Sequence, residues 1–411
     1  MSSAVPEAPA AARTGMPPGL IVLVLSLLLG IQPVTTDLYL PALPALTQEL
    51  HAPIAQAQLT LTTLLLAFGT SQLLWGPLSD RYGRRPVLLC GLGAYTLASV
   101  GCMLAPSMEL LVVWRTLQGA AMGAAVMGAR AIVRDLYTPV TGARVMSKGL
   151  TGLGVIACLC APLGGVLADW SGWRVALSAL GLFGAAALAL VAWRFEESVP
   201  RKNPQALEPR ALLRTWLAIM RHPTFVAYSA LSTASYAGLF TFLASSSFVF
   251  LQVLGLSRRE YGVVMFCVSF VYILGTFLCR RLLPKLGVRR SVAIAGALTL
   301  TGGTLVGLAG EFGWHSPLAI LAPWALFMLA HGVHQPCGQS GAVGPFPQAA
   351  GAASALNGFI MMLAAFFMGR WIGAHLDGTV LALTHGVWFW SVVIAASAWT
   401  LVQWYGEPRS S

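Results

Sequence analysis

One acidic residue lies well inside the first long apolar run of the chain: Asp37, within the segment QPVTTDLYLPALPAL at residues 32–46. An ionised side chain inside a membrane helix costs at least about 2.5–3.5 kcal/mol, so it normally faces a cavity and serves a function. Burial favours the protonated carboxyl group, and a nearby cation favours the carboxylate. Asp37 can therefore exchange a proton with either side of a membrane, or bind a cationic or polar substrate. The alternatives are that it is solvated near the helix end or forms an ion pair that locks the fold.

Arg115 is the natural counter-charge for Asp37. Its apolar run begins near Glu109, which places Arg115 about two helical turns, roughly 9 Å, from that end. Asp37 lies at a similar depth from the same end of its own run, and this matching depth permits an Asp37–Arg115 pair. Gln118 follows one turn later and can share a hydrogen-bond network with Arg115. The alternative is an arginine that snorkels to the membrane surface.

Other polar and aromatic residues within apolar runs are candidates for lining a cavity. His331 and His334 lie three residues apart, which we interpret as one face of a helix. Metal binding would need a third ligand, and no acidic residue is placed to supply one, so we expect no metal site. Internal hydrogen-bonded packing is the alternative for both histidines. The expected cavity-lining residues are Tyr39, Gln118, Tyr236, Phe240, His331, His334 and Asn357.

A short charged segment, GPLSDRYGRRPVLL at residues 76–89, separates two long apolar runs. Its charged residues are Asp80, Arg81, Arg84 and Arg85. The segment is predicted to be a tight loop at a membrane face, and its arginines assign that face to the cytoplasm. Gly76 is expected to let two helices approach closely, and Gly83 to adopt a positive φ in the turn. The alternative is a charged hairpin without a special function.

The composition predicts a membrane protein with many spans. The chain is 57% hydrophobic and 9% charged, with a mean hydropathy of +0.74. A soluble protein needs far more charge to cover its surface. The net charge of +11 does not indicate a nucleic-acid partner, because we place about 20 of the 25 lysines and arginines in expected cytoplasmic loops and tails.

No nucleotide-binding loop, nucleophile elbow or zinc-protease motif is present in the sequence. The sequence therefore lacks the motifs that an enzyme or an ATP-driven pump would need, and we expect no cofactor. The energy source that suits the composition is a proton gradient, in which one charge crossing about 100 mV gains roughly 2.3 kcal/mol.

The hydropathy pattern predicts an all-α protein with twelve transmembrane helices. The expected spans are residues 19–46, 54–76, 86–106, 109–133, 146–168, 174–194, 224–252, 259–281, 291–311, 316–342, 350–374 and 380–404. The even number places both termini on the cytoplasmic side. We expect disordered tails at residues 1–18 and 406–411, six helices in 19–195, a cytoplasmic linker at 196–222 and six helices in 223–405. Pro33, Pro41 and Pro44 predict a broken or curved first span.

A weak internal repeat supports division into two halves. The segment Gly287–Arg290, after the eighth span, resembles Gly83–Arg85 after the second. The position that matches Asp80 is Pro284, so the second copy lacks the acid. Chance placement of basic residues in a cytoplasmic loop is the alternative.

The charged loop resembles the loop between the second and third spans of major facilitator superfamily transporters, which follows the pattern G-x-x-x-D-R-x-G-R-[RK]. The matching residues are Gly76, Asp80, Arg81, Gly83, Arg84 and Arg85. The resemblance implies two pseudo-symmetric six-helix halves around a central cavity, with this loop acting as a cytoplasmic latch.

Further segments resemble the Bcr/CflA group of drug:proton antiporters, named for bicyclomycin and chloramphenicol resistance. Residues 37–44, DLYLPALP, resemble the group's D-x-Y-L-P-x-x-P signature. Residues 115–119, RTLQG, and 134–137, RDLY, resemble its fourth span. For that group the resemblance implies that Asp37 and Arg115 serve proton coupling. It also implies that Asp80, Arg84 and Asp135 form the cytoplasmic latch, which we expect to close the inner gate in the outward-open state.

The fifth span departs from the antiporter signature G-P-x-x-G-G. Residues 161–166 read APLGGV, and only Pro162 and Gly165 fall in register. Small residues and a proline still predict tight helix packing and a bend here. This segment therefore does not decide between antiport and symport.

Together the residues and the resemblance predict a multi-pass protein of the cell inner membrane that exports small organic molecules or drugs in exchange for protons. Its expected partners are the substrate, protons and the lipid bilayer, and we expect a monomer. Proton-coupled transport of a metabolite such as a nucleobase, amino acid or sugar is the alternative. A membrane enzyme or signalling protein would need catalytic groups or a sizeable soluble domain, which the sequence lacks.

Overall fold

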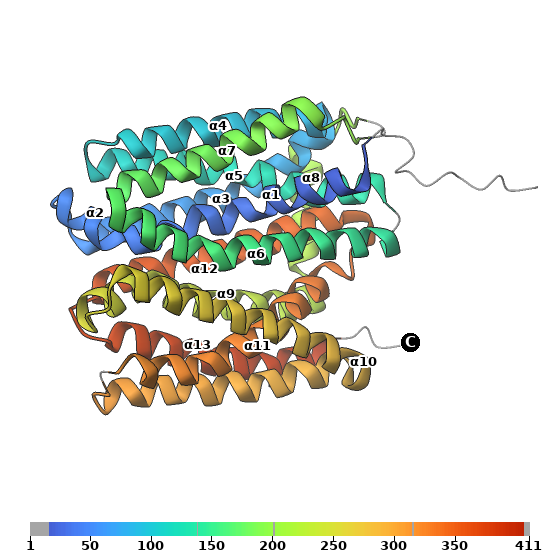
Figure 1. Cartoon of the computed structure of the whole chain (residues 1–411). Coiled ribbons are helices and arrows are strands. Elements are labelled where there is room, and N and C mark those ends of the chain that lie inside the picture. The colour runs from blue at the N-terminus through green and yellow to red at the C-terminus, as the bar shows by residue number, and fades with distance from the viewer. Residues whose placement is uncertain (1–15, 138, 200–201, 315, 407–411) are drawn as a thin grey trace, which may run out of the picture.

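The computed structural model describes residues 16–137, 139–199, 202–314 and 316–406, and all regular elements in these ranges are helical (Figure 1). Most of the two expected tails, residues 1–15 and 407–411, lies outside the described residues. The first half contains α1 (Pro18–Thr36), η2 (Leu40–Ala42), α2 (Leu43–Glu49), α3 (Ile54–Tyr82), α4 (Arg84–Leu104), α5 (Met108–Leu136), α6 (Pro139–Ser171) and α7 (Trp173–Arg194). The connection contains α8 (Pro209–Met220). The second half contains α9 (Pro223–Phe248), η3 (Val249–Val253), α10 (Arg258–Glu311), α11 (Pro317–Val343), η4 (Pro347–Ala349), α12 (Ala350–His375), α13 (Leu381–Trp399) and α14 (Leu401–Tyr405).

Twelve spans are present in the described part of the chain, as predicted. Eleven helical segments are long and apolar enough to cross a bilayer. One of them, α10, has 54 residues, which is far more than the about 20 that a bilayer requires. It changes direction at Gly287, whose φ of 71° and ψ of 175° are not helical, so it supplies two antiparallel spans. The predicted all-α membrane fold is confirmed.

The first span is broken, as its prolines predict. α1 ends at Thr36, a short 3₁₀ turn covers Leu40–Ala42, and α2 completes the span. Pro41 and Pro44 have no backbone N–H to continue a helical ladder, and each disfavours helical geometry in the residue before it. Asp37 lies at the break, as the C-terminal cap of α1.

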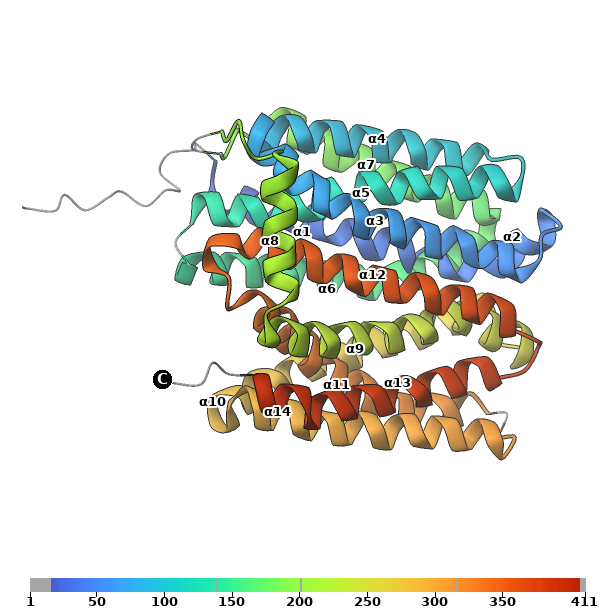
Figure 2. The same ribbon diagram turned by 180° about the vertical axis from the view of Figure 1, so that it is seen from behind.

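The two halves lie side by side with their long helices along one common axis (Figure 1). The first half occupies the upper part of the view and the second half the lower part. They meet where α3 packs on α12 and α6 packs on α10. The described ends of the chain and α8 lie at one end of the bundle (Figure 2), which we call the α8 end; the other is the opposite end.

The connection between the halves contains a helix that the sequence analysis did not predict. α8 crosses the end of the bundle against α9 and α12 (Figure 2). Of its residues only Ile219 is buried, whereas Leu213 and Leu217 are exposed. Leucines at positions i and i+4 with an arginine between them are typical of an amphipathic helix, and this spacing was the overlooked signal.

α3 and α5 approach closely, but not at the predicted glycine. An added Cβ atom at Gly76 would meet only Met127 Cε, at an ordinary 3.7 Å, so the expected role of Gly76 in close packing is wrong. At Gly119 an added Cβ would collide with the Leu64 backbone, and at Gly123 with the Ser71 side chain. Glycines of α5 therefore permit the contact, and this contact sets the position of every functional side chain on α5.

Candidate functional site

A cavity of about 530 Å³ lies between the halves, lined by helices from both of them. This volume is suited to a small organic molecule. Most of the lining is apolar, and the polar minority can fix the orientation of a ligand. The polar lining residues are Gln32, Thr36, Asp37, Gln72, Arg130, Tyr236, Ser269, Tyr272, His331, Gln335, Gln339, Ser354 and Asn357.

Asp37 faces this cavity from the break in the first span. Its Oδ1 accepts a hydrogen bond of 2.8 Å from the Thr36 hydroxyl. None of the ion pairs in the described part of the chain includes Asp37. The carboxyl group is therefore half-buried beside a cavity and has no counter-ion.

Arg115 does not pair with Asp37, so the expected contact is not formed. Its fully buried guanidinium donates from Nη1 to Gln118 Oε1 at 2.7 Å and from Nη2 to the Thr35 carbonyl at 3.0 Å. It also lies 4.3 Å above the centre of the Tyr39 ring. The physical reason is that α1 ends at Thr36, which leaves the Thr35 carbonyl without a helical partner and free to accept. The side chain of Asp37, at the same break, is directed into the cavity instead.

Three of the expected cavity residues line the cavity: Tyr236, His331 and Asn357. The Tyr236 hydroxyl accepts a long hydrogen bond from Gln32 Nε2, at 3.5 Å. His331 Nδ1 and the Ser235 hydroxyl are 2.8 Å apart, which orients the ring. These contacts place polar groups of α9, α11 and α12 opposite those of α1.

Tyr39 and Gln118 do not line the cavity, which corrects the prediction. Both are fully buried beside Arg115. The Tyr39 hydroxyl lies 2.8 Å from that of Thr60, and Gln118 Nε2 donates to the Ser99 hydroxyl at 2.7 Å. They therefore belong to a packed polar network around the guanidinium, inside the first half.

Phe240 and His334 are also absent from the cavity lining. An added Cβ on Gly369 would lie 3.1 Å from the Phe240 ring, so this phenylalanine packs against α12. His334 is fully buried, whereas His331 reaches the cavity. Residues three apart differ by about 60° around a helix. That rotation is enough to direct one histidine into the cavity and the other into the protein core.

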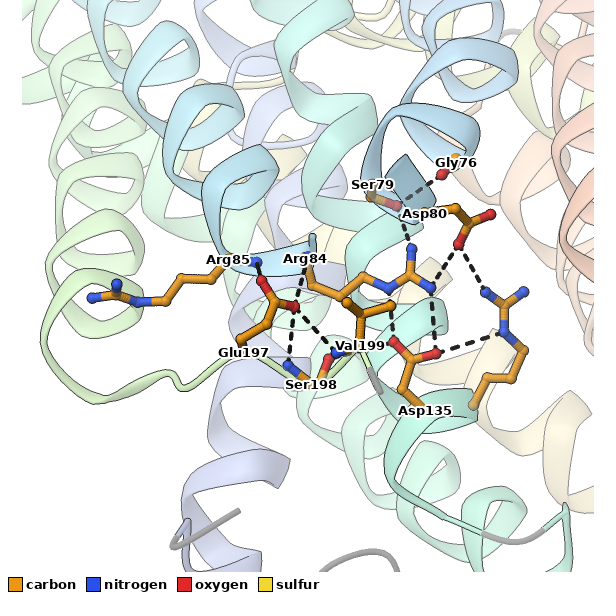
Figure 3. Close-up of polar contacts among 10 residues, drawn as sticks. Gly76, Ser79, Asp80, Arg84, Arg85, Asp135, Glu197, Ser198 and Val199 are labelled. Atoms are coloured by element: carbon orange, nitrogen blue, oxygen red, sulfur yellow. Dashed lines mark hydrogen bonds and ion pairs between the residues drawn. The ribbon is translucent and has the colours of Figure 1, made fainter. Parts of the chain in front are cut away.

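A second site lies at the α8 end, where Arg84 is held between two carboxylates (Figure 3). Arg84 Nη2 lies 2.7 Å from Asp80 Oδ1, and Nε lies 2.7 Å from Asp135 Oδ2. Nη2 also donates to Asp135 Oδ1 at 3.3 Å, and Nη1 to the Ser79 hydroxyl at 2.6 Å. The arginine side chain is only 2% exposed, and that of Asp135 only 7%. We call Asp80, Arg84 and Asp135 the charged cluster.

Gly83 positions this cluster. It is the single residue between α3 and α4, with a φ of 111°. Only glycine adopts this conformation without strain, so the loop shortens to one residue. Ser79 donates its hydroxyl to the Gly76 carbonyl at 2.9 Å, which fixes it beneath Arg84. Arg81 is exposed on the last turn of α3 and is not part of the cluster.

The sequence analysis missed Glu197, which joins the linker to this turn (Figure 3). Its carboxylate accepts hydrogen bonds from the backbone N–H groups of Arg84 and Arg85, at 2.8 and 3.2 Å. It also accepts those of Ser198 and Val199, each at 3.1 Å. A carboxylate at the first turn of α4 caps free N–H groups and suits the positive end of the helix dipole. Glu197 stands 113 residues from Arg84 in sequence, so no local pattern could have identified the contact.

Arg134 extends the cluster towards the second half. Its Nη2 lies 3.4 Å from Asp80 Oδ1, and its side chain is 51% exposed. An added Cβ at Gly351, near the start of α12, would lie 3.0 Å from Arg134 Nη1. The cluster therefore belongs to the first half but borders the second.

At the opposite end of the bundle, ion pairs and close helix packing connect the two halves directly, whereas the charged cluster lies within the first half. Asp169, at the end of α6, lies 3.5 Å from Arg258 Nη1 and 3.3 Å from Arg259 Nε, both at the start of α10. Added Cβ atoms would come within 2.7 Å of the Arg258 carbonyl at Gly165, and within 2.9 Å of Pro162 Cα at Gly262. Pro162 and Gly165 therefore lie in the contact between the halves.

The charged cluster coexists with these contacts. The sequence analysis expected the cluster to close the α8 end while the opposite end is open. In the structure the cluster is formed while the opposite end is closed. The expectation concerns a state in which the opposite end is open, so it stays a prediction. All three members of the cluster lie within the first half and need not separate when the halves move.

The chain is similar to known proteins over most of its length. A sequence model of the family described as Major Facilitator Superfamily matches residues 25–369. The chain is 31% identical to a "Chloramphenicol resistance protein" of Pseudomonas aeruginosa, over 78% of this chain and 75% of the relative. It is 29% identical to "Multidrug resistance protein D" of Escherichia coli, strain K12, over 82% of this chain and 84% of that one. The crystal structure of a D-xylose-proton symporter has the same fold, with a TM-score of 0.75 at 17% identity over 95% of this chain and 98% of that chain.

Proposed function

Because the chain belongs to the Major Facilitator Superfamily, we propose that it exports small organic molecules or drugs across the bacterial inner membrane in exchange for protons. The chain is a multi-pass membrane transporter and not an enzyme. The proposal of drug export is supported by relatives whose names refer to chloramphenicol and multidrug resistance. The observation that carries the mechanism is the unpaired carboxyl group of Asp37 on the wall of a cavity between two helical halves.

Asp37 is the proton carrier in this proposal. Its carboxyl group lines the cavity, accepts a hydrogen bond from the neighbouring Thr36 hydroxyl and forms no ion pair in the described part of the chain. Protonation removes a charge from an apolar site, and substrate release resets the group. Coupling then requires only that Asp37 be accessible from one side of the membrane at a time.

Arg115 acts as a positioning residue rather than as a direct partner of Asp37. It donates to the Thr35 carbonyl at 3.0 Å, on the turn that immediately precedes Asp37. It therefore fixes the broken end of α1 relative to α5.

The α8 end is proposed to face the cytoplasm. The turns at Gly83 and Gly287 and helix α8 all lie there, and arginines cluster in each of them. The opposite end has few basic residues in the described part of the chain, chiefly Arg174, Arg258, Arg259 and Arg370. The positive-inside rule supports this orientation, with both termini in the cytoplasm.

Alternating access then requires the contacts at the opposite end to separate. Asp169 would leave Arg258 and Arg259, and the close packing of α6 on α10 would open. These exposed ion pairs are individually weak, which suits a contact that must be broken in each cycle. One chain supplies both walls of the cavity, so we propose that a monomer is sufficient.

Inverted membrane vesicles test the coupling directly. Vesicles with an acidic interior should accumulate radiolabelled chloramphenicol when they contain the wild-type protein. Asp37→Asn should abolish the part of the uptake that depends on the pH gradient. Asp377→Asn is the matched control, because Asp377 lies in the exposed connection between α12 and α13. Unchanged gradient-driven uptake in Asp37→Asn would show that another group carries the proton.

A further inference from the structure

The cavity contains a second charged residue that the proposed proton step does not use. Among the described residues that line it, Asp37 is the acidic side chain and Arg130 the arginine, and no lysine or glutamate is present. Arg130 lies on α5, six residues before the end of the helix, and is half-buried. Because α5 ends at the α8 end of the bundle, Arg130 lies towards that end of the cavity.

The guanidinium of Arg130 has few protein partners. Nη1 donates to the Ser354 hydroxyl of α12 at 2.8 Å, across the boundary between the halves. None of the ion pairs in the described ranges includes Arg130. A guanidinium has five N–H donors in a planar arrangement that matches a carboxylate or a phosphate. Arg130 lines the cavity, and its one hydrogen bond to Ser354 among the described residues uses only a small part of that donor capacity.

Neither a hydrogen bond between the halves nor anchoring of the helix end explains why residue 130 is a charged arginine. A neutral amide could donate equally well to Ser354, so the hydrogen bond between the halves does not require an arginine. A residue that anchors the helix end would extend to the membrane surface, whereas Arg130 lines an internal cavity. An uncompensated charge inside a membrane protein is costly, and it normally indicates a pathway or a ligand.

Arg130 and Asp37 are too far apart to neutralise each other. Arg115 donates to the Thr35 carbonyl, which places it level with the break in α1 next to Asp37. Arg130 follows Arg115 by fifteen residues on the same helix, which corresponds to roughly 22 Å along the axis. The two charges therefore lie towards different ends of the cavity and can serve separate tasks.

The rest of the lining indicates the chemistry of the molecule that would occupy this site. Neutral hydrogen-bonding side chains from α3, α11 and α12 lie towards the Arg130 end. Apolar and methionine side chains supply much of the remaining lining, where flexible thioethers adapt to varied shapes. The neutral polar side chains are Gln72, Gln335, Gln339, Ser354 and Asn357, and the methionines are Met146, Met265, Met328, Met361 and Met362. No carboxylate is present near Arg130 among the described lining residues to repel an anion.

We propose that Arg130 is an anion-binding residue of the substrate site, so that the protein prefers amphipathic organic molecules with a carboxylate or similar anionic group on an apolar, aromatic body. The guanidinium binds the anionic group, the methionines contact the body, and Asp37 remains available for the proton. This assignment rests on the proposed export function and specifies its substrate class.

A matched pair of dyes tests the assignment. A rhodamine with a free carboxylate and its methyl ester differ only in the anionic group, and fluorescence anisotropy reports their binding to the purified protein in lipid nanodiscs. The wild-type protein should bind the free acid about tenfold more tightly than the ester, since a charge-assisted hydrogen bond is lost with the ester. Arg130→Gln should remove this preference, and Arg130→Lys should retain part of it.

Ser354→Ala is the control for a role limited to the contact between the halves. It removes the side-chain hydroxyl that accepts from Arg130 in the described part of the chain but leaves the charge, so the preference for the free acid should persist. Size-exclusion profiles and thermal unfolding of each variant show whether it has folded. Equal binding of acid and ester by the wild type, no binding of either dye, or a preserved preference in Arg130→Gln would each overturn the assignment.

Transport of the same dyes separates this assignment from the export function. In proteoliposomes, gradient-driven transport of the ester without any preference for the acid would leave the export function intact and reject the anion site. Absence of gradient-driven transport for both dyes and for chloramphenicol would instead reject the export function itself.

Discussion

The turns at Gly83 and Gly287 have nearly the same backbone but very different surroundings. Their φ and ψ angles are 111° and 159° at Gly83, and 71° and 175° at Gly287. Each turn joins two antiparallel helices at the α8 end and is followed by arginines. At Gly83 an added Cβ atom would collide with the carboxylate of Glu197, whereas at Gly287 it would meet nothing within 4 Å.

The charges around the two turns differ even more. Arg84 is nearly inaccessible between Asp80 and Asp135. In the second half Pro284 stands where Asp80 would be, and no ion pair in the described ranges includes Arg289 or Arg290. The two halves therefore share the backbone conformation of this turn but not the ion pairs around it. A one-residue turn requires only glycine, whereas the charged cluster requires acids from other helices, so the cluster is a separate addition to the first half.

The largest expected effect comes from breaking the cluster at its centre. Arg84→Gln leaves Asp135 buried without its cation, which should destabilise the protein by about 3–5 kcal/mol and abolish transport. Equilibrium unfolding in detergent micelles measures the stability, and vesicle flux measures the transport. Arg290→Gln at the second turn is the control and should change neither quantity appreciably. Equal losses of stability and transport in Arg84→Gln and Arg290→Gln would contradict a special role for the charged cluster of the first half.

The second prediction compares the two glycines. Both conformations are nearly exclusive to glycine, so Gly83→Ala and Gly287→Ala should each cost about 1–3 kcal/mol in backbone strain. Gly83→Ala should cost more, because Glu197 must also move away from the new methyl group. Unfolding free energies of the two variants give the difference. A larger loss at Gly287 would contradict the importance of the linker contact.

The third prediction concerns the linker carboxylate. Glu197→Ala removes the acceptor for two N–H groups at the start of α4 and should destabilise the protein by about 1–2 kcal/mol. Glu208→Ala is the matched control, because Glu208 is an exposed acid of the same linker and its side chain makes no capping hydrogen bond. Unfolding measurements and vesicle flux check both variants. If Glu197→Ala and Glu208→Ala have equal unfolding free energies and equal flux, the linker contact has no role in stability or transport.

The smallest expected effect on stability is that of Asp80→Asn. The side chain of Asp80 is 39% exposed, so its pair with Arg84 is screened by water and should contribute only about 0–1 kcal/mol. Transport should weaken while dye binding in nanodiscs stays largely intact, because Asp80 lies outside the cavity lining. A loss of dye binding would place Asp80 in the substrate site instead of at the boundary between the halves.

The sequence alone determined the features that depend on local chemistry. Apolar runs long enough to cross a bilayer predicted the twelve spans, and the prolines predicted the break near Asp37. Glycine, the residue that tolerates a positive φ, predicted the turn at Gly83. The positions of Asp37 and Arg115 within their spans also followed from hydropathy, because a charge in an apolar run is visible without knowledge of any contact.

Only the tertiary structure decided which side chains meet. Arg115 contacts the Thr35 carbonyl instead of Asp37, Glu197 caps a helix far away in the sequence, and Arg130 reaches Ser354 in the other half. These contacts depend on how each helix is rotated about its own axis. In a membrane protein both the lipid-facing and the core-facing sides of a helix are apolar, so the sequence carries little periodic signal for that rotation. This is also why His331 could not be distinguished from His334 before the helices were packed.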